Sequence, residues 1–266
     1  TKGNCVKMSG TGAGYDQSVA TYSPDGKVYQ VEYALKAIEN SGTTIGVRCK
    51  DGVVLGVEKL LTSKMLAPGS NRRVHSVDDH ITVAVTGLLA DGRVLVKRAA
   101  DECRGYRQNF GEPIPPKVLA ERMAGFFHAF TSYWAYRPYG ATLTIGGYDA
   151  ELGEHELYQA EPTGDVGRYF GIAVGKGTRS AKTEIEKYAF GEKTCSEALG
   201  YLAKIMHTVH DDVKDKPFEL ELSWVTAETG WRAATVPADA RDAANAWALA
   251  KIEEEDEMSD DSDSDQ

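Results

Sequence analysis

Hydrophobic residues recur along this chain with two periods, and each period predicts a different element. Residues 43–50 and 52–59 alternate apolar and polar positions and are joined at Asp51-Gly52, a dipeptide that favours a two-residue hairpin turn. Before this hairpin, apolar residues spaced three and four apart predict a short amphipathic helix over residues 27–39. We therefore expect a helix followed by two antiparallel strands.

The same two patterns continue to residue 252. Further strands are predicted at residues 73–77, 81–87, 141–149, 155–160, 168–175, 218–226 and 231–236. Further helices are predicted at residues 88–107, between Pro116 and Arg137, and at residues 179–190, 195–213 and 237–252. The helix after Pro116 places a stripe of large apolar residues, ending at Trp134, on one face.

The order of these elements predicts the fold class. Strands, a helix pair, strands and a second helix pair follow one another, which differs from the strand–helix alternation of a doubly wound parallel sheet. Two antiparallel sheets packed face to face, with helix pairs on both outer faces, would bury every apolar stripe. We therefore expect an α+β fold with four layers, an αββα sandwich.

Composition divides the chain into three parts. Residues 1–21 are rich in Gly, Ser and Thr and lack periodicity, which predicts a mobile N-terminal arm. Residues 22–252 form one expected domain. Residues 253–266 hold nine acidic residues and no basic one, so we expect a disordered acidic tail. Met8 heads a stretch typical of a native start, so residues 1–7 read as an upstream extension, although the sequence does not decide this.

The acidity of the chain is concentrated in that tail. The whole sequence has 40 acidic and 30 basic residues, and 31 acidic residues remain once the nine of the tail are set aside. A nearly neutral body argues against nucleic acid as a partner. Ser259, Ser262 and Ser264 lie among acids, which is typical of sites for acid-directed kinases, and Ser262 fits best. A solubility tail without regulation is the open alternative.

Cysteine and histidine patterns predict neither a metal site nor a cofactor. Cys5, Cys49, Cys103 and Cys195 are scattered without metal-ligand spacing, and no leader sequence is recognisable, which favours a reducing cytosolic or nuclear compartment. His207 and His210, followed by Asp211, could face one side of a helix, but no third ligand is spaced to join them. No apolar run approaches the ~20 residues of a membrane span, so no membrane partner is expected.

One long motif identifies a resemblance to a known family. The run YSPDGKVYQVEYA at residues 22–34, preceded by Tyr15-Asp16, resembles the N-terminal signature of α-type subunits of the 20S proteasome core. The resemblance continues through residues 42–59, 87–96, 137–143, 175–188 and 218–225. It implies a sandwich of the N-terminal-nucleophile hydrolase type, and a seven-membered outer ring stacked on a ring of β subunits. It also implies neighbouring α subunits and regulatory particles or activators as partners, in cytoplasm and nucleus.

The paired threonines after Gly42 raise the question of catalysis. A threonine nucleophile needs a free amino terminus, a base and an acid. The catalytic members of the family carry an Asp sixteen residues after the nucleophile. Counting sixteen residues from Thr43 gives Lys59, which is a cation where an acid is required. Shifting the register brings Glu58 to the acid position but puts Gly42 in place of the nucleophile. We therefore expect no catalytic residue, and keep a self-processing threonine hydrolase with Thr43 as nucleophile as the alternative.

The resemblance also bears on the role of Arg73. The catalytic lysine of the family falls on Arg73, which stays protonated and so cannot act as a tunable base. In α subunits this position helps to bind the C-terminal carboxylate of activator tails, which makes Arg73 a candidate for an activator pocket.

A second group concerns the arm. Tyr15, Asp16, Pro24 and Tyr33 match the cluster that holds the arm of α subunits open, whereas two tyrosines on a helix would otherwise indicate ordinary packing. The common Tyr-Asp-Arg triplet ends in Gln17 here, which removes a cation.

Overall fold

The strands assemble into two five-stranded antiparallel sheets. The computed structural model describes residues 14–67, 69–211 and 215–263. The first sheet has the order β10-β9-β2-β1-β8, with bounds β1 Thr44–Arg48, β2 Gly52–Leu60, β8 Gly171–Val174, β9 Phe218–Thr226 and β10 Ala233–Thr235. The second has the order β3-β4-β5-β6-β7, with bounds β3 Val74–Asp78, β4 Ile81–Gly87, β5 Ala141–Asp149, β6 Glu154–Ala160 and β7 Val166–Arg168.

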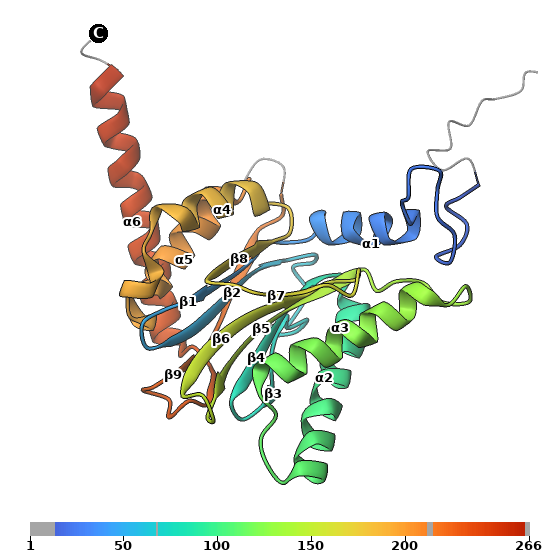
Figure 1. Ribbon diagram of the computed structural model, residues 1–266. Helices are drawn as coiled ribbons and strands as arrows, with labels where there is room; N and C mark the ends of the chain where they lie inside the picture. The colour runs from blue at the N-terminus through green and yellow to red at the C-terminus, as the bar shows by residue number, and fades with distance from the viewer. Residues whose placement is uncertain (1–13, 68, 212–214, 264–266) are drawn as a thin grey trace, which may run out of the picture.

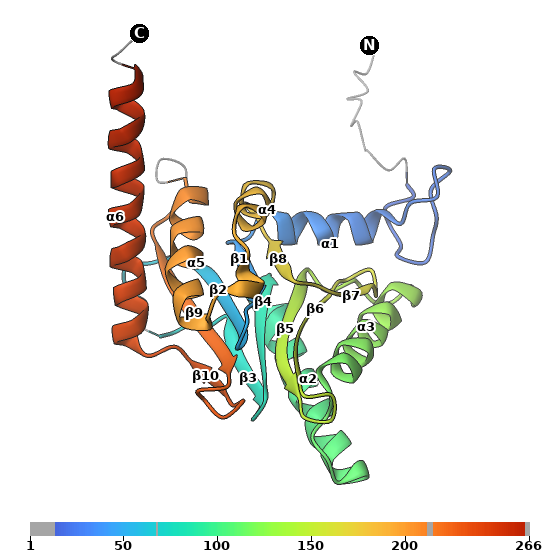
Figure 2. The same ribbon diagram turned by 60° about the vertical axis from the view of Figure 1, so that its left-hand side comes forward.

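Helices cover both outer faces of the sheet pair (Figure 1). Helices α2 (Leu89–Phe110) and α3 (Pro116–Ser132) lie on the second sheet. Helices α4 (Thr178–Lys187) and α5 (Cys195–Val209) lie on the first, joined by a short 3₁₀ turn at Phe190–Glu192. Helix α6 (Ala238–Asp263) packs along α5, as the turned view makes clear (Figure 2). The predicted αββα sandwich is confirmed.

The core between the sheets depends on the close approach of the two sheets to each other. Val53, Leu55 and Leu157 are fully buried there and belong to one cluster formed by both sheets. Gly46 on β1 has no side chain, and a Cβ at this position would come within 2.9 Å of Leu55 and 3.1 Å of Leu157. Burial of each such aliphatic side chain contributes roughly 1.5–3 kcal/mol to folding. A larger residue at Gly46 would therefore force the sheets apart.

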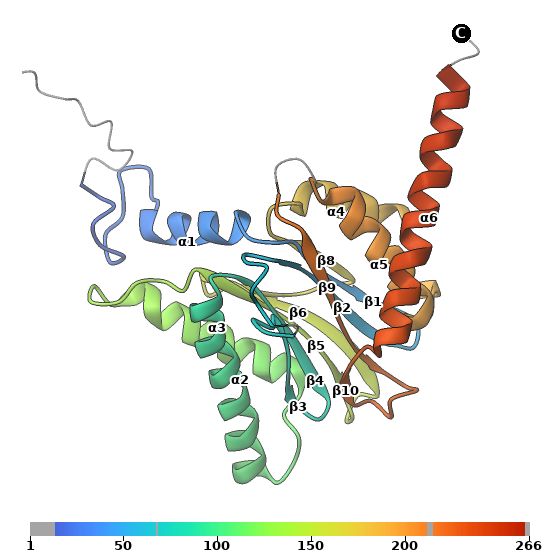
Figure 3. The same ribbon diagram turned by 180° about the vertical axis from the view of Figure 1, so that it is seen from behind.

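Helix α1 (Tyr29–Glu39) closes one end of the sandwich, and Figure 3 shows it from behind, away from α6. Its last turn places Ile38 in the core between the sheets at 4% exposure. The chain then passes through Asn40 and Ser41 and enters β1 at Thr44. The helix that precedes the hairpin in sequence is thereby fixed at the edge where the hairpin begins.

Three predicted elements have other bounds in the structure. The strand predicted at 168–175 is two strands, because β7 pairs with β6 in one sheet and β8 pairs with β1 in the other. Trp134 does not belong to the α3 stripe. The helix ends at Ser132 with Tyr133 in extended conformation, and Trp134 is 80% exposed. Helix α5 likewise ends at Val209 rather than at residue 213.

The predicted boundary between the domain and its acidic tail falls inside helix α6, which is described as far as Asp263. Helix α6 continues past the predicted end at Ile252. Glu254 pairs with Lys251 at 2.5 Å, and Glu255 pairs with Lys204 of α5, so two of the acids find basic partners. Residues 264–266 lie outside the described part of the chain.

The arm is described from Gly14 onward, and residues 1–13 lie outside the described part. Residues 14–21 include turns, and Val19 is buried at 3% exposure, so the packed body begins before the predicted boundary at Tyr22. Across the described ranges, no helix is long and apolar enough to cross a bilayer.

Candidate functional site

Thr43 lies at the entrance of β1, where a threonine hydrolase would carry its nucleophile. The residue is 1% exposed, and its main-chain N–H donates a hydrogen bond to Glu58 Oε2 at 2.7 Å. Its Oγ1 accepts from the main-chain N–H of Gly177 at 3.2 Å. A nitrogen that sits in a peptide bond and donates its proton cannot also take a proton from the hydroxyl.

Glu58 joins Thr43 to a histidine that is distant in sequence. Glu58 Oε1 lies 2.6 Å from His210 Nδ1, and the side chains of His210 and Glu58 are 3% and 6% exposed. The imidazole therefore bonds to the carboxylate oxygen that does not hold Thr43. Sequence reasoning placed Glu58 in a possible acid position but missed His210, which is 152 residues away.

Lys59 and Arg73 meet at a shared acid. Lys59 Nζ pairs with Glu219 at 2.8 Å and with Glu221 at 3.4 Å. The main-chain N–H of Arg73 donates to Glu221 at 2.8 Å, and its guanidinium donates to the Gly87 carbonyl at 2.7 Å. Burial lowers the pKa of Arg73 and Glu221 partly offsets this, yet an arginine so placed remains a cation. These contacts direct both cations to the glutamates and to Gly87 rather than to Thr43.

The surroundings of Thr43 form a small cavity of about 200 Å³, lined partly by Glu58, Lys176 and Asp211. Lys176 pairs with Asp215. The arrangement can hold the start of β1 rigidly, because the main-chain nitrogen and the hydroxyl of Thr43 each have a structural partner. The described contacts supply neither a free amine nor a base at the hydroxyl.

The predicted arm cluster is partly assembled within this chain. Tyr33 Oη donates to Asp16 Oδ2 at 3.4 Å, so these two residues are brought together. Pro24 is exposed and sits in the turn closed by the bond from Gly26 N–H to the Ser23 carbonyl at 2.9 Å. Tyr15 is 38% exposed and makes no hydrogen bond or ring contact with any residue in the described ranges. The structure thus joins Asp16 to Tyr33 and leaves Tyr15 and Pro24 on the surface.

Gln30 is a contact of this region that sequence reasoning missed. Its Nε2 donates to the main-chain carbonyl of Asp16. The signal was available, because Gln30 lies three residues before Tyr33 inside the signature motif and therefore on the same helix face.

The histidine pair points to separate partners rather than to a shared metal. His207 Nε2 lies 2.6 Å from Asn245 Oδ1, whereas His210 turns to Glu58. Within the described residues, no group of three His, Cys, Asp or Glu side chains could hold a metal ion.

Two of the three candidate phosphorylation serines lie in the described part of the chain. Ser259 and Ser262 lie within the bounds of α6, and Ser264 lies outside the described residues.

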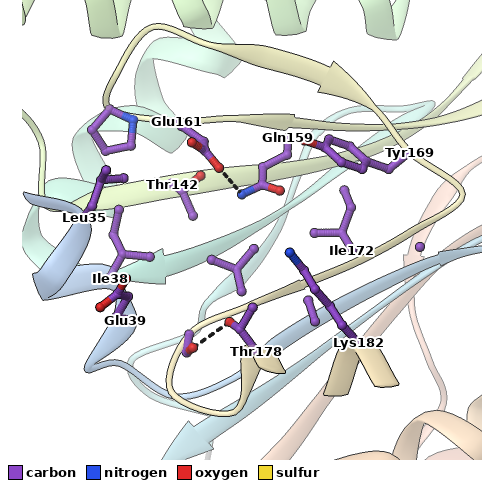
Figure 4. A pocket seen from close by; sticks show the side chains of 15 residues that line it. Leu35, Ile38, Glu39, Thr142, Gln159, Glu161, Tyr169, Ile172, Thr178 and Lys182 are labelled. Atoms are coloured by element: carbon purple, nitrogen blue, oxygen red, sulfur yellow. Dashed lines mark hydrogen bonds between the residues drawn. The ribbon is translucent and has the colours of Figure 1, made fainter. Parts of the chain in front are cut away.

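A second cavity, of about 230 Å³, opens between α1 and strands β6 and β8 (Figure 4). Leu35, Ile38 and Ile172 form its apolar wall. Gln159 Nε2 donates to Glu161 Oε1 at 2.8 Å, and burial raises the pKa of Glu161 because it disfavours the charged carboxylate. Two threonine hydroxyls of its lining are already bonded to main-chain carbonyls, Thr142 to Ala160 at 2.6 Å and Thr178 to Gly175 at 2.6 Å.

Comparisons with known proteins agree with these observations. Residues 38–225 match the proteasome subunit family, and residues 15–37 match the N-terminal signature of its A-type subunits. Proteasome subunit alpha type-3 of Oryza sativa subsp. japonica is 53% identical over 249 residues, which cover 94% of this chain and 99% of the relative.

Two further relatives show the same likeness. Proteasome subunit alpha type-3 of Acanthamoeba castellanii is 52% identical over 252 residues, covering 95% of this chain and 99% of the relative. The probable proteasome subunit alpha type-7 of Saccharomyces cerevisiae is 44% identical over 220 residues, covering 82% of this chain and 76% of the relative. With both sheets, the helix layers and the N-terminal signature in place, the chain belongs to the proteasome subunit family, among its α-type members.

Proposed function

We propose that the chain is a non-catalytic subunit of the α ring of the 20S proteasome core particle, with roles in ring assembly, gating and activator docking. The observation that carries the non-catalytic part is the state of Thr43. Its nitrogen is an amide that donates to Glu58, and its hydroxyl accepts from Gly177. The fold of a hydrolase is kept, while the groups that would activate the hydroxyl are absent from its described contacts.

The gating role is supported by the root of the arm. Asp16 is bonded to Tyr33 on α1, and α1 is anchored in the core through Ile38. An arm that starts from a fixed helix can move without disturbing the sandwich. Individual hydrogen bonds of about 0.5–1.5 kcal/mol each suit a segment that switches between two states.

Docking and modification complete the proposal. Arg73 remains a candidate for binding the terminal carboxylate of activators, although its guanidinium already donates to Gly87. Ser259, Ser262 and Ser264 remain candidate phosphorylation sites, where each phosphate would add about −1.5 to −2 charges. Neighbouring α subunits, β subunits and regulatory particles are the proposed partners, in cytoplasm and nucleus. We infer no cofactor.

Deletion of residues 1–20 tests the gating role in the assembled particle. We expect hydrolysis of short peptides without activator to rise several-fold, because one arm no longer obstructs the axial passage. Removal of residues 258–266 from the other end is the control and should leave this rate unchanged. An unchanged rate after the N-terminal deletion would remove the arm from the mechanism.

The alternative function, a self-processing threonine hydrolase, makes a different demand. It requires cleavage between Gly42 and Thr43, which would free the amine of Thr43 and remove α1 from the chain. The burial of Ile38 at 4% exposure, in the segment that such cleavage would detach from β1, supports the uncleaved form.

A further inference from the structure

The side chain of Gln30 connects the N-terminal segment to helix α1. Its amide Nε2 donates to the main-chain carbonyl of Asp16, in a half-buried position. Tyr33, three residues later on the same face of α1, donates to the carboxylate of Asp16 at 3.4 Å. Asp16 is therefore held at two points, by its main chain and by its side chain.

The two contacts differ in their exposure to solvent. An O–H···O hydrogen bond is normally about 2.5–3.0 Å long, so the 3.4 Å contact of Tyr33, which is 42% exposed, is a weak one. In the part of the chain that the structure describes, no basic side chain forms an ion pair with Asp16, and Gln17 stands where the common triplet of α subunits has a cation. The half-buried amide of Gln30 is thus a second polar attachment of Asp16 to α1, independent of the exposed Tyr33 hydroxyl.

Packing fixes the same segment a few residues later. Val19 is 3% exposed and lines a hollow together with Val28 and Val31, which lie just before and on α1. Gly14, at φ +90, precedes the attached segment and has the conformational freedom of a residue without Cβ. Residues 16–19 are therefore fixed to α1 by a hydrogen bond at Asp16 and by packing at Val19.

We propose that Gln30 is a positioning residue of the arm. By holding the main chain of Asp16, it presents the carboxylate to Tyr33 and sets the direction in which the preceding residues leave the body. Tyr33 acts on the arm only when Gln30 has placed Asp16 within its reach. The positioning role rests on the contacts of α1 alone, whereas its effect on substrate passage rests on the gating role proposed above.

Hydrogen–deuterium exchange of the assembled particle tests the positioning role. In Gln30→Leu, which has no donor, the amides of residues 14–22 should exchange about 2–10-fold faster, as expected for the loss of one neutral hydrogen bond. Gln30→Glu keeps the length of the side chain without the donor and should give the same result. Gln17→Leu is the matched control, since Gln17 is exposed and its side chain makes no bond in the described ranges, and it should exchange as the unchanged protein does.

A double-variant comparison separates positioning from general stabilisation. Tyr33→Phe should speed exchange of residues 14–22 in the unchanged protein but add nothing in the Gln30→Leu protein, because Asp16 is then already out of reach. Additive effects of the two substitutions, or exchange in Gln30→Leu no faster than in Gln17→Leu, would overturn the inference.

Peptide hydrolysis distinguishes this inference from the gating role. The resemblance assigns the Asp16–Tyr33 contact to the open arrangement, so Gln30→Leu should lower the hydrolysis rate in the presence of the regulatory particle. Faster exchange with unchanged hydrolysis, while deletion of residues 1–20 does raise hydrolysis, would overturn the link between Gln30 and the gate. If the deletion also has no effect, the gating role fails and the faster exchange still supports Gln30 as a positioning residue.

Discussion

Thr43 is the residue that would be the nucleophile if the chain were a threonine hydrolase, but its neighbours give it a structural role. Glu58 accepts from its main-chain nitrogen at 2.7 Å, and Gly177 donates to its hydroxyl at 3.2 Å. Both contacts tie the start of β1 to segments farther along the sequence. The residue therefore contributes to the placement of the hairpin.

Substitution Thr43→Ala tests this interpretation at a single atom. Loss of the hydroxyl should cost about 1 kcal/mol of folding free energy, as for one net hydrogen bond, and should leave peptide hydrolysis by the assembled particle unchanged. Thr43→Ser keeps the hydroxyl and is the control. Loss of any one peptidase activity in Thr43→Ala but not in Thr43→Ser would argue for a nucleophile.

The contribution of Asp91 to the stability of the fold should depend on pH. Arg137 donates two hydrogen bonds of 2.7 Å to its carboxylate, and the main-chain N–H of Gly140 donates a third at 2.9 Å. The hydrogen bonds from Arg137 hold the pKa of Asp91 below its usual value, against the opposing effect of burial. Stability from such a carboxylate is complete above the unfolded pKa and is lost as pH falls through the folded pKa.

Asp91→Asn should accordingly lower the free energy of unfolding by about 1–3 kcal/mol at neutral pH. The difference from the unchanged chain should be the same at about pH 7 and pH 5, and should shrink below about pH 4, near the pKa of an unfolded aspartate. Urea unfolding, followed by tryptophan fluorescence, measures the free energy of unfolding of both proteins at each pH. Asp101→Asn on the exposed face of α2 is the control, and a difference that already shrinks between those two higher pH values would contradict the assignment.

At the level of elements, local chemistry explains what the sequence predicted well. The hairpin of β1 and β2 follows from alternation and the Asp51-Gly52 turn, and β5 and β9 begin and end where their patterns do. The split of residues 168–175 could not be predicted, because the two halves pair with strands of different sheets. The continuation of α6 is supported by Lys204 of α5, which is remote in sequence.

In the candidate site, too, the contact within one stretch of chain was predicted and the contact between distant stretches was missed. Asp16 and Tyr33 were predicted from a motif in one stretch of chain, and the structure joins them. His210 was missed as a partner of Glu58, since only the tertiary fold brings the end of α5 against the hairpin.

The start of α5 gives a prediction at this scale. Thr194 and Glu197 form a capping box, in which each side chain bonds the main-chain N–H of the other residue. Thr194→Ala should lower the free energy of unfolding by about 1 kcal/mol, because a first-turn donor loses its acceptor. Ser196→Ala in the same turn is the control for loss of an exposed hydroxyl. Equal effects of the two substitutions on urea unfolding would argue against the capping box.

At the level of the whole molecule, the parts form a consistent assembly unit. The sandwich buries its own core, α1 closes one end next to Thr43, and Asp16 is bonded to α1 through Gln30. Cleavage before Thr43 would remove α1 and the arm together. The proposed gating role therefore requires the uncleaved chain.

Native mass spectrometry of the purified particle, followed by release and mass measurement of its subunits, tests this account most directly. We predict a particle of many subunits that contains this chain with the residues before Thr43 still attached. A released chain that begins at Thr43, or a chain found only as a free monomer in cell extract, would contradict the assignment as a non-catalytic ring subunit.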